Sequence, residues 1–149
     1  MKILVCTDGS KQSQKAIEAA ADIAGGCSAD EVAVIHVYEN KYPTPYWGEG
    51  YHVTRADLER FQEFENKDKE KRQDILSEAA QKFAEKNIKV TTIFKEGHPA
   101  ENIAKAVSDG GYDLVVIGSR GLGGLKKLFL GSVSNAVIQE VQANVLVVK

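Results

Sequence analysis

The residues best suited to chemistry lie between 118 and 139, a stretch that contains no carboxylate but carries Arg120, Lys126 and Lys127. Five of the fifteen residues in 118–132 are glycine. Glycines allow a ligand to approach the backbone closely, and they adopt positive φ angles without strain. A locally positive, glycine-rich loop in an otherwise acidic chain indicates a site for an anion.

The helix expected after this loop begins at Ser132 and has no Asp or Glu in its first turn. Acidic residues there would normally complement the helix dipole. Their absence leaves the N–H groups and hydroxyls of this turn for an external anion, most simply phosphate. The alternative is structural: Gly118 and Gly121 serve tight turns, and Ser132 is only an N-cap. The missing carboxylates favour phosphate binding.

The loop matches neither of the two common phosphate-binding patterns. A Walker A loop needs a lysine directly after a glycine, and the sequence contains no Gly-Lys pair. The dinucleotide pattern fails because Lys126 stands where the third glycine after Gly121 and Gly123 should be. That pattern also follows the first strand of its sheet, whereas this loop follows the fourth.

The elements that must position this loop alternate between strand and helix. Apolar runs predict strands, and residues at three- and four-residue spacing predict helices between them. The first helix is expected to stop at Gly25-Gly26. Alternation of this kind predicts a mostly parallel, doubly wound α/β sheet with helices on both faces. The expected strands are residues 3–5, 31–38, 90–94, 113–118 and 144–148, and the last helix is expected at about 132–141.

Two segments leave alternatives open. Residues 55–89 hold nine basic and nine acidic side chains, which predicts a long exposed helix with ion pairs, either continuous or broken near its middle. The aromatic-rich segment 39–54 is expected to be a loop that covers the site, contacts a partner, or packs its rings on the body. His36 is expected to be a buried sheet residue, and His98 a capping or surface residue.

Composition restricts the class of protein. A chain of 149 residues suits one domain, residues 1–149. A net charge of -2 argues against nucleic acid as a partner, and no apolar run is long enough for a membrane span. Two cysteines do not make a disulfide framework, so we expect a cytoplasmic protein.

The sequence resembles the universal stress protein family, in its nucleotide-binding branch. That branch carries a glycine, two residues, a glycine, nine residues, and then a glycine followed by Ser or Thr. Gly118, Gly121, Gly131 and Ser132 fit this spacing. The resemblance spans the chain except residues 39–70, and it also includes the segments Ile3–Ser10, Val34–Val37, Glu96–Pro99 and Asn144–Val148.

The resemblance implies a five-stranded parallel sheet in the order 3-2-1-4-5, with a nucleotide at the switch between strands 1 and 4. It implies that Thr7, Asp8 and the backbone of Val37 lie at the adenine and ribose end. Asp8 holding a divalent cation through a phosphate is the alternative. The resemblance also implies that the ribose and first phosphates contact Gly118, Ser119, Arg120 and Gly121. It implies that the phosphate tail contacts Gly131, Ser132, Val133 and Ser134.

The function implied is a stress-related regulator or sensor that binds ATP or AMP with Mg²⁺. The resemblance also implies a homodimer formed through the C-terminal strand, residues 144–149. The alternative is an enzyme that hydrolyses ATP slowly or forms adenylates, although no residue stands out as a dedicated base or nucleophile. A protein-interaction dimer with an empty site is disfavoured by the intact glycine spacing.

Overall fold

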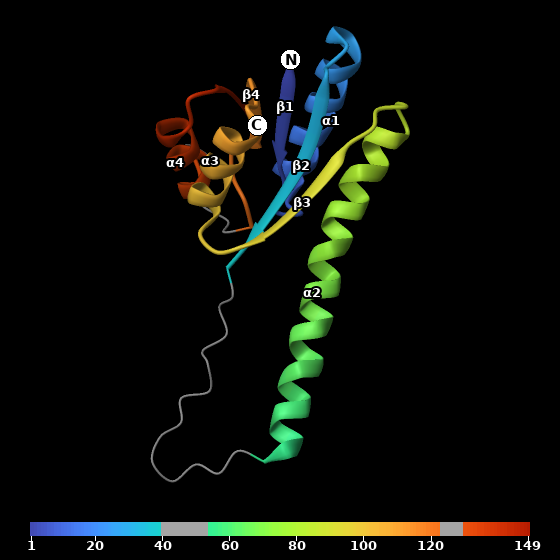
Figure 1. The fold of residues 1–149 in the computed structure, drawn as a ribbon, viewed down its shortest axis with the longest axis vertical. Helices are drawn as coiled ribbons and strands as arrows, with labels where there is room; N and C mark the ends of the chain where they lie inside the picture. The colour runs from blue at the N-terminus through green and yellow to red at the C-terminus, as the bar shows by residue number, and fades with distance from the viewer. Residues whose placement is uncertain (40–53, 123–129) are drawn as a thin grey trace.

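The computed structural model describes residues 1–39, 54–122 and 130–149, which form one five-stranded sheet. All four strand pairs are parallel, and the order is β3-β2-β1-β4-β5 (Figure 1). The predicted α/β fold and its 3-2-1-4-5 order are therefore confirmed. The strands are β1 Lys2–Cys6, β2 Glu31–Tyr38, β3 Thr91–Glu96, β4 Leu114–Gly118 and β5 Asn144–Val148.

Four helices cover the two faces of this sheet. One face packs against α1 and α2, and the other against α3 and α4. Alternate residues of each central strand enter opposite layers: Ile3 and Val5 face α1 and α2, while Leu4 and Cys6 face α3 and α4. This double burial explains the continuous apolar runs in the sequence. The helices are α1 Lys11–Cys27, α2 Arg55–Ala84, α3 Pro99–Gly110 and α4 Ser132–Glu140.

Several expected boundaries were wrong. Helix α1 does not stop at Gly25-Gly26; it continues to Cys27 and ends at Ser28, whose φ of 49° is left-handed. Glycine in the last helical turn costs only about 1 kcal/mol relative to alanine, so two glycines do not force an end there. Strand β3 runs to Glu96 instead of residue 94, because its ladder with β2 continues as far as Tyr38.

Helix α2 is continuous over 30 residues, so the break left open by the sequence does not occur. Thr54 caps it in a capping box with Asp57. Its fully buried residues, Leu76, Ala79 and Phe83, all lie in the C-terminal third. Figure 1 shows the N-terminal half extending well beyond the sheet. The predicted loop at 39–54 falls almost entirely on residues 40–53, which lie outside the described residues, as do Lys126 and Lys127.

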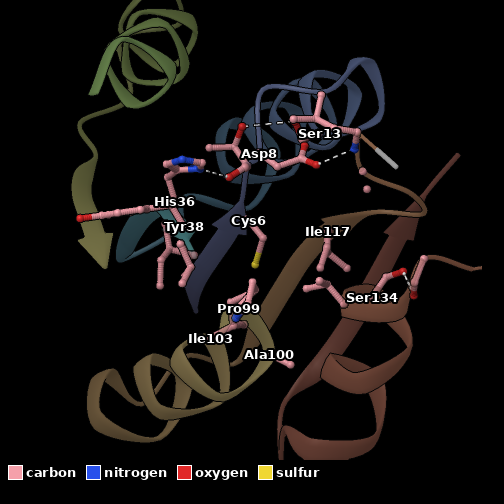
Figure 2. Close-up of a pocket in the computed structure, with 18 of the residues that line it drawn as sticks. Cys6, Asp8, Ser13, His36, Tyr38, Pro99, Ala100, Ile103, Ile117 and Ser134 are labelled. Carbon is pink, nitrogen blue, oxygen red and sulfur yellow. Dashed lines mark hydrogen bonds between the residues drawn. The ribbon is translucent and has the colours of Figure 1, made fainter. Parts of the chain in front are cut away.

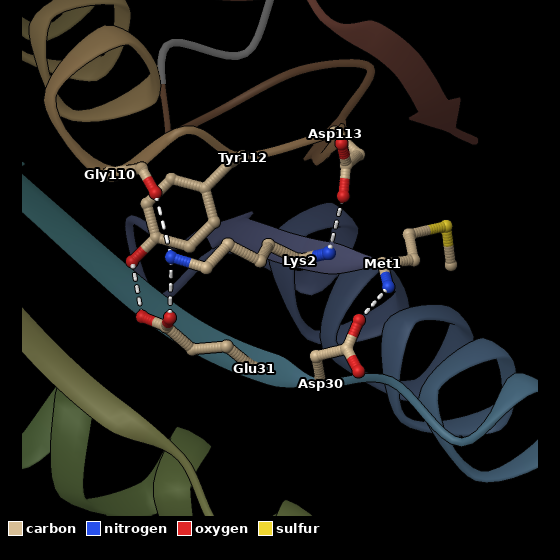
Figure 3. Close-up of polar contacts among 7 residues, drawn as sticks. All are labelled: Met1, Lys2, Asp30, Glu31, Gly110, Tyr112 and Asp113. Carbon is tan, nitrogen blue, oxygen red and sulfur yellow. Dashed lines mark hydrogen bonds and ion pairs between the residues drawn. The ribbon is translucent and has the colours of Figure 1, made fainter.

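A polar cluster joins the amino ends of the central strands (Figure 3). The Lys2 ammonium lies 2.8 Å from the Glu31 carboxylate and donates to the Gly110 carbonyl at 2.9 Å. It also lies 5.8 Å from the centre of the Tyr112 ring, and the Lys2 backbone N–H donates to Asp113. These contacts connect β1 and β2 with the turn that follows α3, at the end of the sheet opposite the strands' carboxyl ends.

Replacing Glu31 with glutamine is expected to make the Tm of the protein depend less on pH in the acidic range. The hydrogen bond from Lys2 lowers the pKa of Glu31 below its ordinary value of 4.5. The stabilisation is therefore present above pH 4.5 and is lost as the pH falls through the lowered folded-state pKa. We expect Glu31→Gln to have a slightly lower Tm than the natural protein at pH 7, because the pair is exposed. The difference between the two Tm values should shrink as the pH falls below 4.5 and through the lowered folded-state pKa of Glu31.

Thermal melts at a series of pH values measure this difference. Glu18→Gln on the exposed part of α1 is the matched control, and it should follow the natural protein throughout. A Tm difference that is the same at pH 7 and pH 3 would contradict a stabilising role for the ionised Glu31.

Candidate functional site

The carboxyl ends of β1, β2 and β4 open into one cavity of about 980 Å³ (Figure 2). Ligands bind at this edge of doubly wound sheets, where the strand order reverses between β1 and β4. All but one of the residues predicted to form the site line this cavity. They are Thr7, Asp8, Val37, Gly118, Arg120, Gly121, Gly131, Ser132, Val133 and Ser134.

Ser119 is the predicted residue that does not line the cavity. Only 2% of it is exposed, and its backbone joins three segments. Its N–H donates to the Val148 carbonyl at 2.7 Å, and its carbonyl accepts from the Gly131 N–H at 2.8 Å and the Ser134 hydroxyl at 3.2 Å. Ser119 therefore positions the start of α4 from behind the cavity wall.

Asp8 connects the two loops that meet at the switch point. Its Oδ1 accepts the Ser10 N–H at 3.0 Å, and its Oδ2 accepts the Leu122 N–H at 3.2 Å. Ser10 in turn caps α1, whose first turn lies directly behind this loop. Each carboxylate oxygen has a second lone pair, so Asp8 is able to accept from ribose hydroxyls without breaking these bonds.

Glycine is present at the three positions of the predicted motif for different structural reasons. A Cβ on Gly118 would lie 2.8 Å from the Gln12 carbonyl carbon and 2.9 Å from the Ser13 nitrogen, both in the backbone of α1. A Cβ on Gly121 would lie 2.3 Å from the Asp8 carboxylate. A Cβ on Gly131 would meet nothing nearer than 3.4 Å. Close packing therefore explains Gly118 and Gly121, whereas Gly131 leaves space at the start of α4.

Helix α4 begins at this space without a side-chain cap. Its N-cap is Gly131, so the alternative in which Ser132 caps the helix was wrong. The first turn contains no acidic residue. The Ser134 hydroxyl donates within the loop, at 2.9 Å from the Gly131 carbonyl, and does not cap the turn's N–H groups. An uncapped helix N-terminus that faces a cavity favours an anion.

The part of the cavity wall next to α3, which packs beside α4 on the same face of the sheet, is apolar. Figure 2 shows Cys6, Ile103 and Ile117 together with the start of α3, where Pro99 and Ala100 also line the cavity. Burial raises the pKa of the Cys6 thiol to about 12, so this sulfur is not a thiolate nucleophile at neutral pH. An apolar wall next to polar loops suits a nucleotide, with its base on the apolar wall and its phosphates at the polar loops.

The two histidines near the site have different settings. His36 is 5% exposed and its Nδ1 lies 2.8 Å from the Thr7 carbonyl, so it is the buried sheet residue expected from the sequence. Because a carbonyl only accepts, Nδ1 is the donor. His98 is the N-cap residue of α3, but its side chain makes no cap hydrogen bond and is 57% exposed, as expected for a residue at the cap or the surface.

The cavity wall formed by α2 was not predicted from the sequence. Asp68, Arg72 and Ile75 line the cavity, together with Lys71 and Tyr38. Their spacing of four and three residues continues the apolar face that carries Leu76 and Phe83 into the core. That spacing was the available signal, because it extends the core-facing side of the helix beyond its apolar part.

Residues 1–39, 54–122 and 130–149 contain no cluster of three or more His, Cys, Asp or Glu placed to hold a metal ion. No helix in those ranges is long and apolar enough to span a membrane.

Fold and cavity together define a doubly wound α/β protein with a cavity at its topological switch point. The universal stress protein family model matches residues 1–149, and the chain belongs to that family. The chain is 36% identical over 148 residues to universal stress protein YxiE of Bacillus subtilis, covering 99% of this chain and 98% of YxiE.

Two solved structures extend the comparison. The structure of MJ0577, a universal stress protein of Methanocaldococcus jannaschii, superposes with a TM-score of 0.78 at 30% identity, covering 99% of this chain and 94% of that one. A universal stress protein from Archaeoglobus fulgidus, solved in complex with dAMP, has a TM-score of 0.63 at 20% identity, covering 100% and 98%. At that identity the likeness shows the fold.

Proposed function

We propose that this protein binds an adenine nucleotide, ATP or AMP, in the cavity at the switch point and acts as a cytoplasmic stress-related regulator or sensor. The observation that carries the proposal is the uncapped, carboxylate-free N-terminus of α4 facing the same cavity as the Asp8 loop. Phosphates lie at α4 and the base lies on the α3 wall, against Val37 and Ile103. The dAMP complex of the related protein supports this choice of ligand.

Mg²⁺ fits the site as a companion of the phosphates. The Asp8 carboxylate contacts the start of the glycine loop, where its Oδ2 accepts the Leu122 N–H. Magnesium is commonly bound by one or two carboxylates together with substrate phosphates and water. When bound, the ion would neutralise phosphate charge, with Asp8 as its protein ligand.

Catalysis is the second candidate function, either slow ATP hydrolysis or adenylate formation. Among the described lining residues, the Cys6 thiol is held protonated and His36 is buried and bonded to a backbone carbonyl. Any hydrolysis would therefore rest on positioning by the cation and the backbone. Release of pyrophosphate or phosphate over many turnovers would favour the catalytic alternative over a binding module.

A homodimer through β5 completes the proposal. Strand β5 pairs only with β4 within the sheet, and its residues Val145 to Val148 remain partly exposed. An open apolar edge needs protection, and pairing with the same edge of a second copy across a twofold axis supplies it. Light scattering should then report twice the 16.2 kDa chain mass.

Calorimetry with purified protein tests the proposed ligand. AMP and ATP, each with and without Mg²⁺, should bind at micromolar to millimolar Kd with one nucleotide per chain. Mass spectrometry of small molecules released from freshly purified protein should find an adenine nucleotide. If neither nucleotide binds with Mg²⁺ present, the proposal is wrong.

A further inference from the structure

The cavity continues on the other side of β2, away from the α3 wall. Successive strand residues point to opposite faces, so Val37 packs towards α3 and α4 while His36 and Tyr38 face α2. Figure 2 shows His36 and Tyr38 on one side of the cavity and Ser134 on the other. The wall on the His36 side comes from the middle of α2, and no role has yet been assigned to it.

Arg72 is held in a fixed position in this wall. Its Nη2 lies 2.5 Å from Asp68, and its guanidinium carbon lies 4.5 Å from the centre of the Tyr38 ring. Tyr38 is itself fixed, because it stacks on Phe94 at 4.8 Å and its hydroxyl donates to Glu96 at 3.0 Å. Only 19% of the Arg72 side chain is exposed. A guanidinium with this support loses little conformational freedom when it binds a further anion.

The side of the cavity next to α2 carries mixed charges, with Arg72 and Lys71 as cations and Asp68 and Glu39 as anions. Asp68 offsets Arg72, and Lys71 adds a second cation that also lines the cavity. Arg72 has five N–H donors. Within the part of the chain that the structure describes, its guanidinium pairs with the Asp68 carboxylate and lies over the Tyr38 ring. The cavity therefore has two separate positive positions, the N-terminus of α4 with Arg120 and the pair Lys71 and Arg72 on α2.

The size of the cavity agrees with a ligand that reaches both positions. A volume of about 980 Å³ lies at the upper end of the roughly 300–1,000 Å³ typical of ligand pockets. A nucleotide with phosphates only at its 5′ end places all its negative charge on one side. A second phosphate on the ribose provides charge in another direction, towards α2.

We propose that Arg72 and Lys71 form a second phosphate-binding position, and that the preferred ligand is an adenosine bisphosphate with one phosphate at the 5′ position and one on the ribose 2′ or 3′ oxygen. This inference rests on the proposed nucleotide function. The 5′ phosphate binds at α4, the base lies on the α3 wall, and the ribose phosphate pairs with the guanidinium. Arginine suits this task because its N–H groups match phosphate oxygens in pairs.

Titration calorimetry of three ligands tests the assignment: AMP, adenosine 3′,5′-bisphosphate and adenosine 2′,5′-bisphosphate. We expect the natural protein to bind one bisphosphate at least ~10-fold more tightly than AMP. Arg72→Met keeps the aliphatic packing on Tyr38 but removes the charge. It should bring that ratio close to one and leave the AMP affinity within about twofold.

Arg60→Met is the matched control, because Arg60 lies on the same helix in its exposed part, and it should keep the natural ratio. Lys71→Met is a second variant at an exposed position and should lose part of the preference. Circular dichroism checks that each variant is folded. If Arg72→Met does not fold, Lys71→Met still tests the second phosphate-binding position.

Three outcomes would overturn the inference. The first is AMP binding with no bisphosphate preference, which leaves the nucleotide function intact. The second is a preference that survives in Arg72→Met. The third is inorganic phosphate strengthening AMP binding to the natural protein while the bisphosphates gain nothing, because the position then takes a free anion. Failure of all three nucleotides to bind the natural protein would instead refute the proposed function.

Discussion

Gly131→Asp is expected to abolish measurable nucleotide binding while leaving the protein folded. Residue 131 is the N-cap of α4, and aspartate is among the best N-cap residues. Its carboxylate would accept the N–H groups of the first turn, which we assign to the phosphates. It would also place a negative charge beside them. Loss of one or two charge-assisted hydrogen bonds, at about 1.5–3 kcal/mol each, weakens binding by roughly 10-fold to 10,000-fold, before the repulsion between the two negative charges is added.

The same substitution should not lower stability, and this separates binding from folding. An aspartate cap contributes at least as much stability to a helix as glycine does. Gly131→Ala is the matched control, because its Cβ would meet nothing nearer than 3.4 Å and the native φ of -64° suits alanine. Calorimetry should find AMP affinity within a few fold of natural for alanine. Equal affinities of the alanine and aspartate variants would show that phosphates do not bind at α4.

Gly118→Ala is expected to cause the largest loss of stability among the glycine variants. Its Cβ would approach the carbonyl carbon of Gln12 and the nitrogen of Ser13 to within 2.8–2.9 Å. These are backbone atoms of α1, so relief requires the helix to move away from β4. Inserting a methyl group into close packing of this kind costs about 1–3 kcal/mol, sometimes more. For a chain of this size that lowers Tm by roughly 3–10 °C.

Gly26→Ala provides the matched control. Gly26 lies inside α1, near its end, and a Cβ there would meet nothing within 4 Å. Alanine in a helix is favoured over glycine by roughly 0.5–1 kcal/mol, so this variant should melt at or above the natural temperature. Denaturant unfolding of both variants measures the contrast. If Gly118→Ala has the same free energy of unfolding as the natural protein, the end of β4 and α1 do not pack as closely as described.

The elements could be predicted from the sequence because burial leaves a direct pattern. A strand covered on both faces needs a continuous apolar run, and Val32 to Ile35 and Leu114 to Ile117 have one. The order of the strands in the sheet could not be predicted from these runs, because an apolar run looks the same wherever its strand lies. The order 3-2-1-4-5 came from the family resemblance.

The residues predicted for the candidate site lie at the ends of strands or belong to the spaced glycine motif and the helix turn after it. Asp8 follows β1, Gly118 ends β4, Gly131 and Ser132 complete the motif, and all four line the cavity. The α2 wall was missed because Arg72 reaches the cavity through long-range packing on Tyr38, 34 positions earlier, and charged residues on a helix usually indicate solvent. The reason for Gly118 was missed as well, because its contact with the α1 backbone is tertiary.

Helix α2 is continuous, and it has three different surroundings along its length. Its C-terminal third is clamped in the core by Leu76 and Phe83, its middle forms a cavity wall at Arg72, and its first turns stand in solvent. One uninterrupted run of helical backbone hydrogen bonds therefore links the cavity wall at Arg72 to a solvent-exposed surface near Arg55.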